Sequence, residues 1–233
     1  MSLSNFLPPI LSRKLRNMRK YAALNQLDKQ LECHLDPQQA GYFVELGAND
    51  GLMQSNTCFL EKRFGWRGVL IEPQPAAFIE LMRNRSADNY FACVACVAAD
   101  CESEFVRMRF AGLMTATYGL TDLPSGVLAH TNVGRRFLPP QVRPFDFAAI
   151  TSTLQRVLED ANAPQGIDLL FLDVEGYELS VLAGVNHERT RFKHLLVESK
   201  SPDKLTEFLD SFGYEWVSAL SNHDYLFRER ARA

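Results

Sequence analysis

Several signals that assign chains to common protein classes are missing here. No apolar run approaches the roughly 18 residues that a membrane-spanning helix needs. The formal net charge is -3, whereas proteins that bind nucleic acid non-specifically usually carry a strongly basic face. The first residues, MSLSNFLPPILSRKL, lack the basic region and sustained apolar region of a secretory signal. We therefore expect a cytoplasmic protein without a transmembrane segment or a nucleic-acid partner.

The cysteines form no pattern of a disulfide framework or a zinc site. There are five, and an odd number in 233 residues is not typical of a secreted, disulfide-linked domain. The stretch CVAC has the spacing of half a zinc site, but no second pair follows it. If YFACVACV is a strand, Cys93 and Cys96 point to opposite faces. We expect buried, unreactive cysteines.

What the chain does have, from Gly41 onward, is an alternation of short apolar strands and amphipathic helices. This alternation predicts an α/β fold, a mostly parallel sheet with helices on both faces. The last two strands are joined by the short turn SNH, so one of them should run antiparallel. Strands are expected at 42–46, 68–72, 90–98, 167–173, 194–199, 214–220 and 224–229, and helices at 55–64, 75–85, 151–161, 178–185 and 201–213.

Two segments depart from this rhythm. Residues 1–40 are expected to form a helical, partly basic N-terminal arm. It could bind an acidic partner or an anionic membrane, but we expect it to cover an edge of the domain at 41–233 or a substrate pocket. Residues 103–147 begin with EFVRMRF, which alternates like an edge strand, and continue without a stable period. A long insertion of this kind is often a binding loop, and we predict a lid over the acceptor.

The stretch FVELGANDG, residues 43–51, places a glycine turn at the end of a buried strand. In open α/β sheets, ligands bind at the carboxyl ends of the strands. A dinucleotide site would need G-x-G-x-x-G, but Asn49 and Leu52 replace the second and third glycines. Glu45 and Asp50 would also repel a pyrophosphate. A ligand with an ammonium and a sulfonium, such as S-adenosylmethionine, suits these carboxylates better.

Glu72 ends the next strand, about twenty residues further on. A carboxylate at this position can accept hydrogen bonds from the hydroxyls of a ribose. A surface carboxylate would be the simpler interpretation of LIEP alone, but the preceding glycine turn favours the ribose. The cofactor-binding residues predicted here are Glu45, Gly47, Asn49, Asp50, Gly51, Glu72, Pro73, Cys96 and Val97.

From about Gly41 to Phe227 the chain resembles the FkbM-type S-adenosylmethionine-dependent methyltransferases. The stretches that carry the resemblance are FVELGANDG, SNTCFLEKRFGWRGVLIEPQP and IDLLFLDVEGYELSVLAG. The resemblance implies a Rossmann-like, seven-stranded methyltransferase sheet and S-adenosylmethionine as cofactor. It also implies methylation of a hydroxyl on a sugar, glycan or natural product. The insertion matches no motif of the family.

The stretch FLDVEGYE supplies the candidates for catalysis. Asp173 ends a strand in the ligand crevice and could orient the acceptor or take its proton. Glu175 is equally suited to the turn and to function, whereas Glu178 should cap the following helix. Glu198 ends the next strand and is a second candidate base. Two strand-end carboxylates could hold a divalent cation, but we predict no metal site.

Among the five histidines only His223, in the turn before the last strand, has a position suited to chemistry. The chain is therefore expected to be an O-directed methyltransferase acting on a small-molecule or glycan acceptor, with Asp173, Glu175 and Glu198 as catalytic residues. Two alternatives remain: an oxidoreductase that uses NAD or a nucleotide sugar, and a non-catalytic interaction or membrane-adaptor protein on a cofactor-binding fold.

Overall fold

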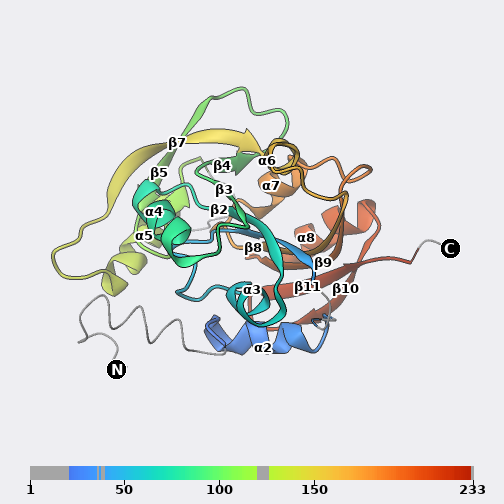
Figure 1. Ribbon diagram of the computed structural model, residues 1–233. Helices are drawn as coiled ribbons and strands as arrows, with labels where there is room; N and C mark the ends of the chain where they lie inside the picture. Colours follow the sequence, from blue (N-terminus) through green and yellow to red (C-terminus); the bar gives the residue numbers. More distant parts are fainter. Residues whose placement is uncertain (1–20, 36, 38–39, 120–125, 232–233) are drawn as a thin grey trace.

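The computed structural model describes residues 21–35, 37, 40–119 and 126–231, and the chain forms two β-sheets with helices packed around them (Figure 1). The larger sheet has seven strands and the smaller has four. The expected basic stretch LSRKLRNMRK lies outside the described residues. Of the expected N-terminal helix, the structure shows a short 3-10 turn, η2 (Leu24–Gln26), and the helix α2 (Leu27–Glu32).

The seven-stranded sheet has the order β10-β11-β9-β8-β1-β2-β3. Only β11 runs against its neighbours, because it pairs antiparallel with both β9 and β10, whereas the other pairs are parallel. The mixed α/β fold with one late antiparallel strand is therefore confirmed. Its strands are β1 (Tyr42–Leu46), β2 (Arg67–Ile71), β3 (Tyr90–Ala92), β8 (Gly166–Leu172), β9 (Arg191–Glu198), β10 (Tyr214–Ala219) and β11 (Asp224–Glu229).

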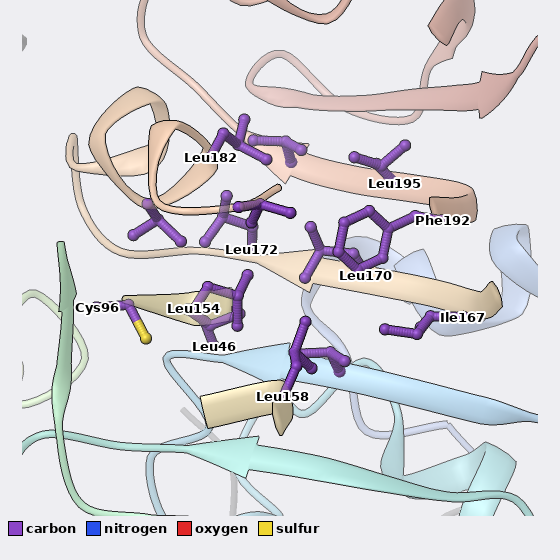
Figure 2. Close-up of a cluster of buried hydrophobic side chains, with 14 of the residues drawn as sticks. Leu46, Cys96, Leu154, Leu158, Ile167, Leu170, Leu172, Leu182, Phe192 and Leu195 are labelled. Carbon is purple, nitrogen blue, oxygen red and sulfur yellow. The ribbon is translucent and has the colours of Figure 1, made fainter. Parts of the chain in front are cut away.

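Alternate residues of the central strands pack against two different layers of helices. Leu46, Leu172 and Leu195 belong to a core cluster with the helices on one face, and Figure 2 shows Leu46 beside Leu154 and Leu172 near Leu182. These helices are α6 (Leu154–Asp160), α7 (Glu178–Ala183) and α8 (Pro202–Ser211). Phe43 and Phe171 face the other layer. It consists of α2, α3 (Cys58–Phe64) and α4 (Pro75–Asn84). Burial of both faces explains the nearly continuous apolar strands.

The insertion is not irregular, as its sequence suggested, but folds into most of the four-stranded sheet, of order β4-β7-β5-β6. Its helix α5 (Gly126–Gly134) continues into η3 (Arg135–Phe137), next to β5 and β6. The strands are β4 (Ala95–Val97), β5 (Phe105–Phe110), β6 (Ala116–Thr117) and β7 (Phe145–Thr153). The prediction that β5 is an edge strand is wrong, since this strand pairs on both sides.

Two other boundaries differ from the sequence prediction. The expected strand at 90–98 is two short strands, because the chain leaves the large sheet after β3 and enters the small sheet at β4. The helix expected from residue 151 begins at Leu154, because Thr151 to Thr153 still belong to β7. The hydroxyl of Thr153 accepts a hydrogen bond from the Arg156 amide at 3.1 Å and so caps this helix.

Within the described parts of the chain, no helix is long and apolar enough to cross a bilayer.

Candidate active site at the carboxyl edge of the sheet

The glycine turn after β1 packs directly against the end of β8. Gly47 has a φ of +76°, and a Cβ there would lie 2.0 Å from the carbonyl oxygen of Asp173. No side chain can occupy that space. Gly51 also has a positive φ, +75°, and a Cβ at Gly51 would lie 2.7 Å from side-chain atoms of Arg85 and Leu81. Both glycines are therefore required by close approach as well as by backbone conformation.

Glu72 joins the ends of β1 and β2. Its Oε2 accepts a hydrogen bond from the Asn49 amide at 2.9 Å, and its Oε1 accepts one from the Gln74 amide at 2.9 Å. Asn49 itself has a positive φ of 46°. Glu72 is buried, and burial raises the pKa of its carboxyl to about 7. The hydrogen bonds from the two amides lower this pKa but do not offset the effect of burial. The carboxylate has further lone pairs with which to accept ligand hydroxyls.

Asp173 carries a buried acceptor atom without a partner. Although the residue as a whole is partly exposed, its Oδ1 is buried and receives no hydrogen bond within the described structure. Burial, with a further contribution from Glu198, raises its pKa well above the ordinary value. Buried polar atoms are rarely left unpaired, so this oxygen marks a place where a ligand group fits.

Further carboxyl groups surround Asp173. Burial, followed by the charge of Glu175, raises the pKa of Glu198 to about 8. Asp224 lies beside Glu198 in the sheet register, and burial raises its pKa too. These carboxyl groups repel one another when ionised, so this edge of the sheet favours a cationic ligand. Among the described residues, no three His, Cys, Asp or Glu side chains are grouped as a metal ion would require.

The turn between β8 and α7 is held by Glu178. Its Oε1 accepts hydrogen bonds from the amides of Gly176, at 2.8 Å, and Val174, at 3.3 Å. The expected structural role of Glu178 at the helix start is thus confirmed. Glu175, in the same turn, has a φ of +56°, which is strained for a residue with a side chain. Glu178 stabilises this conformation, and Glu175 is thereby directed at the insertion.

Glu175 connects the acidic edge to α5 of the insertion. Its Oε2 lies 2.9 Å from Nε2 of His130, at an angle outside hydrogen-bond alignment, and 3.5 Å from Nζ of Lys200. Lys200 Nζ is also 3.5 Å from Nδ1 of His130. His130 is 8% exposed. This three-residue contact links α5 of the insertion to the strand ends that carry Asp173 and Glu198.

The side chain of Glu45 points away from the carboxyl groups around Asp173 and into the layer of α3 and α4. Its side chain is 1% exposed and forms an ion pair with Arg85 at 3.1 Å. Its oxygens also accept hydrogen bonds from Ser55, from the amide of Asn56, and from the Thr57 hydroxyl at 2.5 Å. Arg85 binds Glu61 as well, at 2.9 Å. The contact of Glu45 with the cofactor stays a prediction.

The other predicted cofactor residues have local partners. Asp50 Oδ1 accepts hydrogen bonds from the amides of Leu52 and Met53 and so closes the glycine turn. Cys96 and Val97 are buried in β4, where burial raises the Cys96 pKa to about 12. The Val97 carbonyl lies 2.2 Å from where a Cβ of Gly184 would be. Pro73 is half-buried next to Glu72. Their roles toward cofactor stay predictions.

Comparison with known proteins agrees with the resemblance. Residues 45–227 match the methyltransferase FkbM domain. The chain belongs to this family. A search of curated proteins found no match. Two solved structures are similar: the methyltransferase FkbM of Methylobacillus flagellatus KT, at 14% identity and a TM-score of 0.46, and the precorrin-6y C5,15-methyltransferase of Geobacter metallireducens GS-15, at 13% and 0.44. The match to the first structure covers 81% of this chain and 43% of that chain. The match to the second covers 91% of this chain and 95% of that chain. This chain thus spans less than half of the first.

Four residues that contact the candidate site residues were not found by sequence reasoning. His130 and Lys200 showed no partner pattern, and Arg85 lies 40 residues from Glu45. Asp224 offered a usable signal: the first residue of an antiparallel last strand lies beside the last residues of its parallel neighbours. His223 was singled out, and its Nε2 lies 3.6 Å from Asp224 and 4.0 Å from Glu198.

A surface cavity of about 650 Å³ lies at the opposite end of β9 and β11. It is distant from the carboxyl edge, and ion pairs such as Arg228 with Glu215, at 2.6 Å, already satisfy its charges. We do not assign it to the candidate site. Its lining is Lys193, His194, Glu215, Arg228, Glu229, Arg230 and Ala231.

Proposed function

We propose that this protein is an S-adenosylmethionine-dependent methyltransferase that methylates a hydroxyl group of a sugar, glycan or natural product. The observation that carries the proposal is the junction of three strand ends: Gly47 packs on the Asp173 carbonyl, and Glu72 binds the Asn49 amide in the same turn. This junction lies where open α/β sheets bind their ligands. Membership of the FkbM family supports methyl transfer.

The residues at this edge fit the charge and shape of S-adenosylmethionine. Glu72 has free lone pairs for the two ribose hydroxyls, and the crowded carboxyl groups around Asp173 favour the cation. When bound, the cofactor supplies an electrophilic methyl carbon on a positively charged sulfur. Gly47 and Gly51 keep the turn free of side chains so that a ligand can approach the backbone.

Asp173 is the proposed acceptor of the hydroxyl proton. Methyl transfer forms a bond between the acceptor oxygen and the methyl carbon while the bond from carbon to sulfur breaks. The hydroxyl proton must then leave the oxygen, and a carboxylate within reach can take it. The raised pKa of Asp173 makes its ionised form a stronger base than an exposed aspartate. Glu198 and Glu175 are the alternative bases, and alignment and exclusion of water supply the rest of the rate enhancement.

The acceptor pocket is proposed to lie between the strand ends and the insertion, which would act as its lid. The contact of His130 with Glu175 and Lys200 supports this, because it joins α5 to the edge that bears Asp173. All five cysteines are free thiols, as a reducing compartment maintains them, and we propose the cytoplasm as the place of the reaction.

Calorimetric titration of the purified protein tests the cofactor. S-adenosylmethionine and S-adenosylhomocysteine are expected to bind, and NAD is not, because Asn49 and Leu52 stand where a dinucleotide turn needs glycine. Binding of NAD alone would favour an oxidoreductase. Methyl-labelled cofactor is then incubated with the protein and extracts of the source cells. Label in a base-stable small molecule or glycan supports O-methylation, whereas cofactor binding without any transfer would favour a non-catalytic interaction protein.

A further inference from the structure

Helix α5 and the 3-10 turn η3 expose an apolar surface that nothing in the described structure covers. Phe137 is 78% exposed, the largest exposed fraction of any large hydrophobic side chain described, and Leu128 and Val133 are 55% and 43% exposed. At helical periodicity the exposed residues occupy one continuous side. We call this side the α5–η3 face, and it consists of Leu128, Ala129, Asn132, Val133, Arg136 and Phe137.

The other side of α5 explains why the exposed side is unusual. Val127, His130, Thr131 and Gly134 are buried, and Gly134 packs on the turn that contains Ala111 and Met114. Leu113, in that same turn, is 40% exposed. A surface helix ordinarily turns charged and polar residues outward, whereas α5 exposes Leu128 and Val133. An exposed apolar surface on such a helix marks an interaction site.

The segment at residues 126–145, which contains the α5–η3 face, carries charge of one sign. Residues 126–145 contain no aspartate or glutamate and three arginines, Arg135, Arg136 and Arg143. All three are exposed, and none has a carboxylate partner within the described structure. The chain as a whole has a net charge of -3, so this local excess is not a general property of its surface. Arginines beside exposed apolar side chains are complementary to a layer with anionic headgroups above an apolar interior.

We propose that the α5–η3 face docks on an anionic membrane surface, with Phe137, Leu128 and Val133 at the headgroup boundary and the arginines on the lipid phosphates. A second copy of this chain fits less well, because a two-fold contact through this face would oppose two sets of unpaired arginines. Nucleic acid fits less well too, since the face offers one aromatic ring and otherwise aliphatic side chains to bases that stack on aromatics.

The position of the face agrees with this. Figure 1 shows the segment from α5 to the start of β7 at the outer end of the molecule, on the side opposite β10 and the C-terminus. A flat surface can approach there without meeting the seven-stranded sheet. Helix α5 turns His130 toward Glu175 at the acidic edge and Phe137 outward. The proposal goes beyond methyl transfer and does not depend on it.

Vesicle flotation with the full chain tests the proposal. Vesicles of phosphatidylcholine with 30 mol% phosphatidylglycerol are compared with pure phosphatidylcholine, and about tenfold stronger binding to the anionic vesicles is expected, weakening as salt is raised. Arg135→Ser/Arg136→Ser should lower the partition coefficient roughly 25-fold, at about fivefold for each arginine near the surface. Phe137→Ser should lower it about tenfold, because that side chain would leave the interface.

The matched control is Arg156→Ser/Arg189→Ser, which removes the same charge from exposed arginines on another part of the surface. Its binding should stay within about twofold of the unaltered protein, since the charge is lost far from the membrane. Circular dichroism and the thermal midpoint confirm that each variant folds. Equal binding to neutral vesicles, or no binding to either kind, overturns the proposal.

The proposal is also overturned if the chain floats with anionic vesicles but the variants of the α5–η3 face float equally well, because another basic segment then binds. A dimer in light scattering that Phe137→Ser dissociates would assign the face to a second copy instead. Retention of polyuridylate by the unaltered protein but not by the arginine variant would assign it to nucleic acid.

Discussion

Asp173 has a buried acceptor oxygen that receives no hydrogen bond from the described residues, and the pKa of its carboxyl is raised by burial and by Glu198. In the free protein, ionisation of a carboxyl in this environment costs free energy, because burial and neighbouring carboxylates disfavour its charged form. That cost is removed when a cation or a proton donor arrives. The residue is therefore suited to a ligand that carries a hydroxyl proton near a positive charge, which is the arrangement in methyl transfer from a sulfonium to an alcohol.

Replacement of this carboxylate separates its possible roles. Asp173→Asn is expected to leave cofactor affinity nearly intact and to lower turnover by roughly 100-fold or more, the usual scale for a general base. Stopped assays with labelled cofactor and calorimetry measure the two quantities. A variant that keeps full activity and loses about 1 kcal/mol of stability would show that Asp173 only supports the turn. Activity that a chelator abolishes and magnesium restores would make it a metal ligand.

Glu72 is expected to bind the ribose. Loss of a hydrogen bond to a charged group costs about 1.5–3 kcal/mol, so Glu72→Gln should weaken binding of S-adenosylhomocysteine by at least about tenfold. Glu80→Gln, an exposed glutamate on the following helix, is the control and should bind as the unaltered protein does. Equal affinity of both variants by calorimetry would remove Glu72 from the cofactor site.

Glu72 also makes stability depend on pH. Its pKa is raised from 4.5 to about 7 in the folded protein by burial. Below pH 4.5 the carboxyl is protonated in both the folded and the unfolded state. Between about pH 4.5 and 7 the folded protein holds the proton and the unfolded chain releases it, so the free energy of unfolding falls as pH rises.

The fall caused by Glu72 should reach about 3 kcal/mol at pH 8, since a tenfold difference in proton affinity between the folded and unfolded states corresponds to about 1.4 kcal/mol. Urea unfolding of the unaltered protein and of Glu72→Gln at pH 5 and pH 8 measures it, and comparison at each pH cancels the contributions of other groups. The variant should lose less stability than the unaltered protein between the two values. Parallel curves would show that Glu72 keeps its ordinary pKa.

At the scale of elements, the ion pair of Arg85 with Glu45 fixes α4 to β1 and to the segment before α3. Both side chains are almost completely inaccessible to solvent, at 0% and 1% exposed. Arg85→Met should destabilise the protein by about 3–5 kcal/mol, because the Glu45 charge would be left buried without its partner. Arg83→Met, in the last turn of α4 with a side chain 62% exposed, should change the free energy of unfolding by less than about 0.5 kcal/mol.

A second replacement distinguishes the loss of the ion pair from the loss of side-chain packing. Arg85→Met combined with Glu45→Gln should recover much of the stability in urea unfolding, because the Glu45 charge is removed and Glu61, the other partner of Arg85, keeps its hydrogen bonds from the Ser86 amide and the Asn89 side chain. If the double variant is as unstable as the single one, packing of the arginine against Phe43, whose ring centroid is 5.3 Å from its Cζ, is the main contribution.

The elements that local sequence determines were predicted well, and those that depend on distant pairing were not. The strands that carry Glu72, Asp173 and Glu198 are apolar and lie between helices, which is enough to place their ends at one edge. The strand β7 was missed because its residues gain their pairing from β5, and Arg107 and Asp146 meet across 39 positions of the chain. Glu45 has the sequence context of a ligand residue, and only its contact with Arg85 shows where its charge is directed.

At the scale of the whole molecule, two sheets with different roles are joined at two places. The chain passes from the large sheet to the small one between β3 and β4 and returns from β7 to α6. Away from these connections, His130 on α5 meets Glu175 and Lys200 at the acidic edge. Movement of α5 relative to the sheet that holds the carboxylates would break this contact.

Hydrogen exchange tests the insertion as a moving cover. Between about residues 110 and 145, amide exchange should slow when cofactor and the acceptor found by labelled transfer are both bound, because closure over the pocket removes opening motions. The strands β8 and β9 serve as the internal reference and should change little, since their core is already buried. His130→Ala should speed exchange in α5 of the free protein by breaking the contact with Glu175. Strong, equal protection of this segment in the free and the liganded protein would instead make it a fixed part of the fold, and the acceptor would then have to enter along the strand ends themselves.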